Sequence, residues 1–443
     1  MHARLLAFWD DLRSSYWFIP SLMAVGAVAL AFGTVHLDTV WGDEWIRDVD
    51  WLRANKPDGA RQLLSTVAGS MIGVAGVTFS ITIASVVYAS GQYGPRLLTN
   101  FIADRGNQVT LGTFIATFLF CLLVLRTIRA ADEADAADAV GPFVPHLAVL
   151  VAFGLALASI AVLIYFIHHV PESIHVSNVI AGVGRELDTR VQTLFPERVG
   201  EATGGESAAD VPADAVDVPA DGAGYVQGVD SDALVAIAVR YDLLLHVCAR
   251  PGDFVAEGDA LVSAWPPDRV SDGARAALRR AFAWGNQRTG RQDVHFLFNE
   301  LVEIAARALS PGVNDPFTAI SCLDWLAAAL KRLTAAGVPG PNRLDDAGTL
   351  RVIALPKRFP EFVDAVYGQL RPYLAGDRNA ALHALVTLGE IAGRTRHPDQ
   401  LAALRFQCDA LAEAVRKTLV IPADLAAVQA QADATALRFA RAM

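Results

Sequence analysis

The sequence predicts a multi-pass α-helical membrane domain with four transmembrane helices, followed by a cytoplasmic α+β region that combines a small β-barrel-like unit with a helical bundle. The first supporting observation is composition: hydrophobic residues make up 53% of the chain and the mean hydropathy is +0.34, above the usual range for a soluble protein. The second is position, because the apolar excess is concentrated before Val170. The third is the series of short apolar runs and longer helical patterns in the second half of the chain.

Four apolar runs are each long enough to cross the roughly 30 Å of hydrocarbon in a bilayer, which takes about 20 helical residues. They cover residues 17–37, 65–89, 109–128 and 143–170. The first run reads as a retained span rather than a cleaved signal, because Asp10 and Asp11 lie among the basic residues ahead of it and its apolar core is long. We therefore expect a four-span membrane domain over residues 1–170.

The orientation of these spans follows from the charges of the short loops. Lys and Arg residues divide nearly evenly between the two sides of the predicted membrane domain, so the loop charges alone give little indication of its orientation. The large charged C-terminal half follows no translocation signal of its own, which favours the inside. We expect a protein of the bacterial cytoplasmic (inner) membrane with both termini in the cytoplasm and the lipid bilayer as a partner.

Cysteine usage and net charge exclude several classes of protein. The four cysteines are scattered without C-x-x-C spacing, which argues against a zinc knuckle or a disulfide framework and suits a reducing compartment. The net charge of −10 argues against a nucleic-acid partner. We expect no metal and no cofactor.

The second span carries two unusual stripes when its residues are placed at about 100° per residue on a helix. One face holds Thr78, Thr82, Ser85 and Gln92, and the opposite face holds Gly69, Gly73, Gly76 and Ser80. The small-residue face permits close helix packing. The polar face has two interpretations: its hydroxyls bond back to carbonyls of their own helix, or they line an aqueous pathway. Arg96 lies on the same angular face near the inner mouth, although Gly94 and Pro95 are expected to bend or end the helix first.

The rest of the chain divides by composition. Residues 171–199 read as an amphipathic connecting helix, residues 200–223 as a flexible acidic linker, residues 224–268 as a small β domain, and residues 269–443 as a mainly helical domain. Short apolar runs, among them 234–238, are the expected strands of the β domain. The string PGDFVAEGDALV resembles the turn-and-strand pattern of small biotinyl/lipoyl-type barrels, but no lysine lies between Lys56 and Lys331 to be modified. A purely structural barrel is the favoured interpretation.

Seven helices and one further strand are expected after the β domain. The helices are predicted near 271–289, 292–309, 316–336, 359–374, 378–395, 398–418 and 422–441, and the strand near 350–355. Asp315 and Pro316 form a helix-start signal, with the aspartate as cap and the proline in the first turn.

Candidate cytoplasmic site residues surround the start of that helix and the helix before it. They are Asp293, Glu300, Glu303, Arg307, Asn314 and Asp315. Glu303 and Arg307 have the spacing of a helical ion pair. Buried ion pairs and a tight inter-helix turn are the structural interpretation, and a ligand or interface site is the functional one. No catalytic residue is assigned and no enzyme is expected, because no H-E-x-x-H, G-x-S-x-G or phosphate-loop motif accompanies these residues.

Three stretches resemble a known family. They are VTFSITIASVVYASGQYGPRLLTNFIADRGNQVTLGTFIATFLFCLLVLRTIR (77–129), HHVPESIHVSNVI (168–180) and RQDVHFLFNELVEIAARALSPGVNDPFTAISCLDWL (291–326). These strings resemble a family of predicted bacterial membrane proteins, domain-of-unknown-function family 2254 (DUF2254). The resemblance implies an N-terminal multi-span region and a C-terminal cytoplasmic region, and it carries over no activity and no catalytic residue.

Two functional hypotheses follow from these patterns. The first is a homo-oligomeric, channel-like membrane protein whose second span lines a pathway for water or ions and whose cytoplasmic domain assembles or gates the ring. The alternative is a membrane-anchored regulatory or scaffold protein that binds a ligand or partner through its cytoplasmic domain. The channel requires several copies of the chain around an axis, whereas the scaffold is compatible with a monomer.

Overall fold

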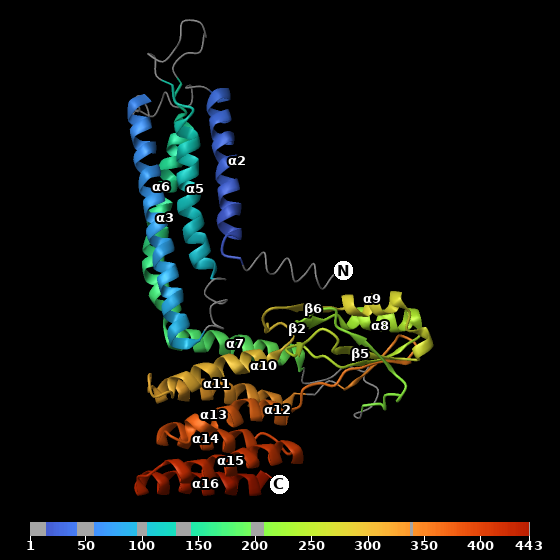
Figure 1. The fold of residues 1–443 in the computed structure, drawn as a ribbon. Helices are drawn as coiled ribbons and strands as arrows, with labels where there is room; N and C mark the ends of the chain where they lie inside the picture. Colours follow the sequence, from blue (N-terminus) through green and yellow to red (C-terminus); the bar gives the residue numbers. More distant parts are fainter. Residues whose placement is uncertain are drawn as a thin grey trace. The chain divides into compact units, whose positions relative to one another are not determined.

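A computed structural model gives the fold of residues 15–41, 57–94, 104–129, 143–195, 208–336 and 340–442, which are the residues described below (Figure 1). The chain separates into two compact units. One, the membrane unit, holds the described residues up to His175, and the other, the C-terminal unit, holds those from Val176 onward. Each unit has its own packed interior.

Four long helices make up the described part of the membrane unit. They are α2 (Phe18–Trp41), α3 (Pro57–Tyr93), α5 (Arg105–Leu125) and α6 (His146–Ile174). All four are long and apolar enough to cross a bilayer, so the four predicted spans are confirmed as candidate membrane helices. Helix α3 starts earlier than expected, at Pro57, a residue suited to a first helical turn, and α6 continues through Pro171 instead of ending there.

Helix α5 packs against each of the other three helices and buries more of its surface than they do. The helices meet largely through small side chains, including Ala27, Ala31, Ala68, Ala148 and Ala152. A β-carbon added at Gly112 of α5 would lie 3.2 Å from the Cα atom of Pro20 on α2. Without a hydrophobic driving force in lipid, such close backbone approach is a main source of helix association.

The C-terminal unit contains a stack of helices that follow one another in sequence order (Figure 1). They are α7 (Val176–Leu194), α10 (Val294–Ala308), α11 (Pro316–Ala335), α12 (Phe359–Val363), the π-helical segment η5 (Asp364–Gly368), α13 (Gln369–Leu374), α14 (Arg378–Ala392), α15 (Pro398–Thr418) and α16 (Pro422–Ala442). Helix α7 packs on α10 and α11, α11 packs on α14, and α14 packs on α15 and α16. The predicted amphipathic connecting helix is therefore the first layer of this stack.

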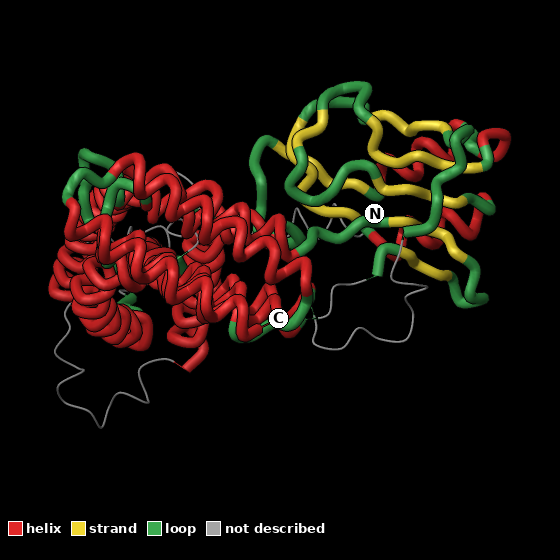
Figure 2. Tube along the Cα trace, turned by 90° about the horizontal axis from the view of Figure 1, so that it is seen from below, coloured by secondary structure: helices red, strands yellow, loops and turns green. Residues whose placement is uncertain are grey.

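The strands gather in one part of the C-terminal unit (Figure 2). They are β1 (Val216–Pro219), β2 (Gly224–Val229), β3 (Leu244–Val247), β4 (Phe254–Val255), β5 (Ala260–Trp265), β6 (Phe282–Gly285), β7 (Asn342–Leu344) and β8 (Leu350–Ile353). One sheet has the order β1-β5-β3-β8-β7 and the other β4-β2-β6. These described strands form no closed barrel, so the barrel-like detail of the prediction is not confirmed.

The sheets recruit segments from outside the predicted β domain. Strand β1 comes from the stretch expected to be a linker, and β6 and β7 come from stretches of the predicted helical domain where no strand was expected. Strand β8 confirms the strand predicted near 350–355. Strand β8 runs parallel to β3, with Leu245 opposite Val352. Such a pairing joins residues more than a hundred positions apart in the chain, and local sequence patterns carry no information about it.

Residues 234–238, expected to be a strand, belong instead to helix α8 (Ser231–Tyr241). Asp230 caps this helix by accepting a hydrogen bond from the backbone N–H of Ala233, and Asp242 ends it in a left-handed conformation at φ 49°. Leu234 and Ala238, one helical turn apart, are both buried in the core shared with the sheets. A short apolar run fits either element, and here the caps select the helix.

A second correction concerns residues 271–289, which were expected to form one helix. Helix α9 (Asp272–Arg280) ends at Arg280, and strand β6 follows at once. Phe282 of β6 is buried and pairs with Val229 of β2. Burial of this aromatic side chain in the sheet therefore overrides the helical pattern of the sequence.

Candidate functional site

The polar stripe of α3 faces the inside of the membrane unit. Thr78 and Thr82 are buried. The hydroxyl of Thr78 donates to the carbonyls of Val74 (3.0 Å) and Ala75 (2.9 Å), and that of Thr82 donates to the carbonyl of Thr78 (2.9 Å). The hydroxyls thus bond back to their own helix, the first of the two interpretations of this stripe.

The structure shows less about the other residues predicted to line a pore. Ser85 is half-buried on the same face. The side chain of Gln92 and the whole of Arg96 lie outside the described residues. A pore lined by this stripe depends on an assembly of several chains, so the pore-lining assignment stays a prediction.

The small-residue stripe of α3 faces outward. Gly69, Gly73, Gly76 and Ser80 are exposed in the membrane unit, and a β-carbon added at any of the three glycines would meet no atom within 4 Å. The hydroxyl of Ser80 donates to the carbonyl of Gly76 (2.8 Å). The glycines were expected to pack against the other spans, and the described spans of the same chain pack against the hydroxyl face instead. Among the described residues, no segment of the same chain packs on these glycines, so their helix-packing role stays a prediction.

Further polar groups lie inside the membrane unit. The hydroxyls of Thr117 on α5 and Ser159 on α6 are buried and lie 3.1 Å apart. At the start of α5, Asp104 accepts a hydrogen bond from the backbone N–H of Asn107 (3.0 Å), and its carboxylate lies 3.0 Å from Nε2 of His169 on α6. The side-chain oxygen of Asn107 is buried and has no hydrogen-bond partner. The interior of the unit is thus more polar than lipid packing requires.

A cavity of about 310 Å³, here called the sheet–helix pocket, lies in the C-terminal unit between the sheets and the helical stack. Its apolar lining includes Leu194, Phe195, Leu234, Val247, Val352 and Phe362. Its charged lining consists of Arg250, Asp293, Arg343 and Lys357. These residues come from parts of the chain up to about 170 positions apart (194 to 362), and a largely apolar pocket with a few convergent polar groups is the usual form of a small-molecule site.

Asp293 is the most constrained charged group of this pocket. It lies at the N-terminus of α10, and its side chain is 1% exposed. One carboxylate oxygen lies 3.0 Å from Nζ of Lys357, and the other lies 2.5 Å from a guanidinium nitrogen of Arg288. The backbone of Gly252, at φ 94°, approaches the carboxylate so closely that a β-carbon would overlap it. A buried carboxylate requires such partners, because an unpaired buried charge is strongly destabilising.

Arg250 and Arg343 are held less tightly. Arg250 lies 3.9 Å from Asp253 and 3.7 Å from Glu361, longer than the about 2.7–2.9 Å of a charge-assisted hydrogen bond. Among the described residues, Arg343 donates only to backbone carbonyls, those of Gly340 and Asn342, and burial lowers its pKa. Both guanidinium groups therefore have donors available for an anion.

His295, on the first turn of α10, lies beside this pocket. Burial, reinforced by the positive charge of Lys357, lowers the pKa of its imidazole to about 4. The ring lies 4.3 Å from that of Phe362, and its Nε2 atom is buried without a hydrogen-bond partner. The imidazole is consequently neutral near pH 7.

The structure separates the predicted cytoplasmic residues. Asp293 lies in the sheet–helix pocket, whereas the other candidates lie outside its lining. Glu300 is buried, Glu303 and Arg307 form the expected pair at 3.8 Å, and Asn314 adopts a left-handed conformation at φ 51°. Asp315 caps α11 by accepting from the backbone N–H (3.2 Å) and hydroxyl (2.6 Å) of Thr318. A carboxylate thus occupies this helix N-terminus.

Sequence reasoning missed Arg250, Arg343 and Lys357. Each lies in a separate segment, and no spacing in the chain connects them with Asp293. Among the described residues, no group of three or more His, Cys, Asp or Glu side chains is placed to share a metal ion.

Comparison with known proteins identifies the class of this protein. The family model described as "Predicted membrane protein (DUF2254)" matches residues 13–390, and the chain therefore belongs to this family. The uncharacterised protein Rv1290c of Mycobacterium tuberculosis is 32% identical over 433 residues, which cover 96% of this chain and 81% of the relative. The uncharacterised protein Mb1321c of Mycobacterium bovis matches with the same figures. No solved structure matches significantly.

Proposed function

We propose that this protein is a membrane-anchored ligand-binding protein. The four apolar helices hold it in a bacterial membrane, and the sheet–helix pocket takes a small ligand with an apolar body and an anionic group. The observation that carries the proposal is the pocket itself, about 310 Å³ in volume with apolar walls and a few charged groups. This volume is at the lower end of the range of about 300–1,000 Å³ for ligand sites. We propose binding rather than catalysis.

The charges of the pocket support an anionic ligand. Three cationic side chains line it, those of Arg250, Arg343 and Lys357, against the single carboxylate of Asp293. Lys357 pairs with Asp293 at 3.0 Å, so the anion would be held by Arg343 and by Arg250, whose contacts with Asp253 and Glu361 are long at 3.9 and 3.7 Å. In a partly buried site their attraction for an anion is stronger than at an open surface, and the planar guanidinium matches a carboxylate.

Saturation-transfer NMR on the purified full-length protein in neutral detergent tests this function. The probes are 2-naphthoate, which has the proposed chemistry, and its neutral analogue 2-naphthylmethanol. We expect 2-naphthoate to bind saturably and Arg250→Gln to weaken it about tenfold, with little effect on the alcohol. Arg405→Gln, an exposed arginine of α15, is the matched control. Equal binding of 2-naphthoate by wild type and Arg250→Gln would contradict the proposal.

A second candidate function is conduction of water or ions by a homo-oligomer. It is favoured by the polar interior of the membrane unit, where Thr117, Ser159 and the unpartnered oxygen of Asn107 are buried. Ion flux from liposomes that contain the pure protein tests it. We expect Ser85→Leu to reduce the flux, while Ile81→Leu, on the exposed face of α3, leaves it unchanged. Tight vesicles under every voltage and osmotic step would exclude conduction.

A further inference from the structure

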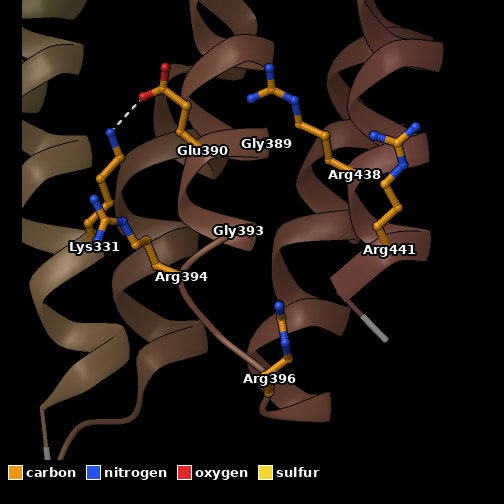
Figure 3. A pocket seen from close by; sticks show the side chains of 8 residues that line it. All are labelled: Lys331, Gly389, Glu390, Gly393, Arg394, Arg396, Arg438 and Arg441. Atoms are coloured by element: carbon orange, nitrogen blue, oxygen red, sulfur yellow. Dashed lines mark hydrogen bonds and ion pairs between the residues drawn. The ribbon is translucent and has the colours of Figure 1, made fainter.

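A second cavity lies within the helical stack of the C-terminal unit, apart from the sheet–helix pocket. It has a volume of about 440 Å³ and lies between α11, α14 and α16 (Figure 3). Five cationic side chains line it: Lys331 of α11, Arg394 and Arg396 after α14, and Arg438 and Arg441 of α16. The cavity is called the basic pocket below.

The charge balance of the basic pocket is opposite to that of the whole chain. Its lining contains five cations and one carboxylate, that of Glu390, whereas the chain carries a net charge of −10. Lys331 already forms an ion pair with Glu390, because its Nζ lies 2.6 Å from Oε2 of that carboxylate (Figure 3). The local surplus is therefore carried by the four arginines.

None of these arginines is paired with an acid at close range among the described residues, although Arg438 is near enough to Glu390 for its charge to help lower the pKa of that carboxyl. Among the described residues, Arg394, Arg438 and Arg441 have no carboxylate within 4 Å, and Arg396 donates only to the carbonyl of Thr395 (3.2 Å). Surface arginines are usually solvated one by one. Here helix α16 and the segment after α14 bring four like charges to one cavity, which costs repulsion that an anion would relieve.

Packing between α14 and α16 holds part of this arrangement in place. A β-carbon at Gly389 would lie 3.1 Å from Cδ of Arg438 and 3.3 Å from Cγ2 of Thr435, so the glycine lets the aliphatic part of Arg438 lie against α14. The hydroxyl of Thr435 is buried and donates to the carbonyl of Leu385 (3.0 Å). Arg438 is thus presented by a rigid helix contact rather than by a loop.

We propose that the basic pocket binds a compact anion with two or more phosphate groups, of which pyrophosphate is the simplest. Guanidinium groups bind phosphate oxygens in pairs and remain charged at every physiological pH. The described residues of the lining include no aromatic and no branched aliphatic side chain to hold a nucleobase or an acyl chain. This second site is distinct from the one proposed above for an apolar ligand and does not depend on it.

Glu390 has a specific part in this proposal. Its carboxylate is the one acidic group in the lining, and it competes with a bound anion for Lys331. Removal of its charge releases Lys331 and removes a repulsion. Glu390→Gln is therefore expected to tighten phosphate binding. A variant that merely disturbed the fold would weaken binding instead.

Calorimetric titration of the full-length protein in neutral detergent with pyrophosphate tests the site. We expect a Kd below about 1 mM at low salt, weakened by added salt because the groups are exposed. Arg438→Gln together with Arg441→Gln should weaken binding at least tenfold, and Glu390→Gln should strengthen it about threefold. Arg405→Gln, which removes one positive charge from α15 away from the pocket, should change it less than twofold. An unchanged circular dichroism spectrum would show that the variants fold.

The remaining titrations identify the source of the phosphate groups. We expect tripolyphosphate to bind at least as tightly as pyrophosphate, ATP no more tightly than tripolyphosphate, and inorganic phosphate more weakly. Binding of dihexanoylphosphatidylglycerol without binding of pyrophosphate would overturn the proposal in favour of a lipid headgroup. The absence of pyrophosphate binding up to about 10 mM, or equal affinity in wild type and the double arginine variant, would also overturn it.

Discussion

The indole ring of Trp325 on α11 lies directly against Gly184 on α7, so closely that a β-carbon at position 184 would overlap the ring. Gly184 is buried in the apolar face of α7, with Ile180, Val183 and Leu187. This contact joins the amphipathic helix that follows the membrane unit to the helical stack. Arg332 of α11 and Asp188 of α7 add an ion pair at 2.5 Å beside it.

Gly184→Ala should therefore destabilise the C-terminal unit. The added methyl group displaces Trp325, and overpacking costs about 1–3 kcal/mol, more than the roughly 1 kcal/mol gained when alanine replaces glycine in a helix. Gly182→Ala on the same helix is the control, because nothing lies within 4 Å of a β-carbon there, and it should be neutral or stabilising. Thermal unfolding in detergent measures both, and an equal shift for the two variants would contradict this account.

His295 should make the stability of the C-terminal unit depend on pH. Its pKa is about 4 in the folded protein because of burial and the nearby charge of Lys357, whereas an unfolded histidine titrates near about 6.5. Because the unfolded state binds the proton first, this contribution is complete above pH 6.5 and is lost as the pH falls toward 4. The loss amounts to at most about 3–4 kcal/mol.

Two variants test this pH dependence. His295→Phe keeps an aromatic ring against Phe362 and removes the titrating group, so the melting temperature should fall less between pH 7 and pH 5 than in the wild type. His397→Phe changes an exposed histidine and should show the same fall in melting temperature between pH 7 and pH 5 as the wild type. If His295→Phe retained the full acid sensitivity, another group would be responsible.

Asp38 of α2 should be essential for the stability of the membrane unit. It is buried, and its carboxylate accepts hydrogen bonds from the backbone N–H groups of Leu147 (2.9 Å) and Ala148 (3.0 Å) at the start of α6. Pro145, at the cap position of α6, makes no side-chain capping bond. Asp38→Ala leaves two donors at this buried helix end without that acceptor and should cost about 2–4 kcal/mol.

Thr34→Val is the matched control on the same helix. Thr34 is also buried, but its hydroxyl donates to the carbonyls of Leu30 and Ala31 of its own helix, so its loss should cost less than about 1.5 kcal/mol. The fraction of protein that survives heating in detergent, measured by size-exclusion chromatography, compares the variants. If both variants lost a similar fraction of protein on heating, the hydrogen bonds from Asp38 to the start of α6 would have no particular importance for stability.

Cys248 provides a native probe of topology. It is exposed, whereas Cys121, Cys322 and Cys408 are buried, and burial raises the pKa of the Cys408 thiol to about 12. If the C-terminal unit is cytoplasmic, as the sequence predicts, a membrane-impermeant maleimide should label the protein only after the cells are permeabilised. Cys248→Ser should abolish the labelling, and labelling in intact cells would place this unit outside.

Local patterns in the sequence predicted most of the helices. The ends of α11, α15 and α16 agree with the expected helices to within one residue, because Pro316, Pro398 and Pro422 mark helix starts through their own backbone geometry. The four spans were equally evident, since length and hydropathy alone select a membrane helix. The helix in place of the strand at 234–238 and the strand at 282–285 were missed, because short apolar runs fit both elements.

The sequence by itself determined that this chain enters a membrane and that its second span has a hydroxyl face and a glycine face. Only the tertiary structure decided that the hydroxyls point into the membrane unit and the glycines away from it. It also decided where charge gathers: Asp293 meets Lys357, and Arg438 and Arg441 share a cavity with Arg394. The physical reason is that periodicity reports which residues share a face, whereas the partner of that face is set by packing between segments distant in the chain.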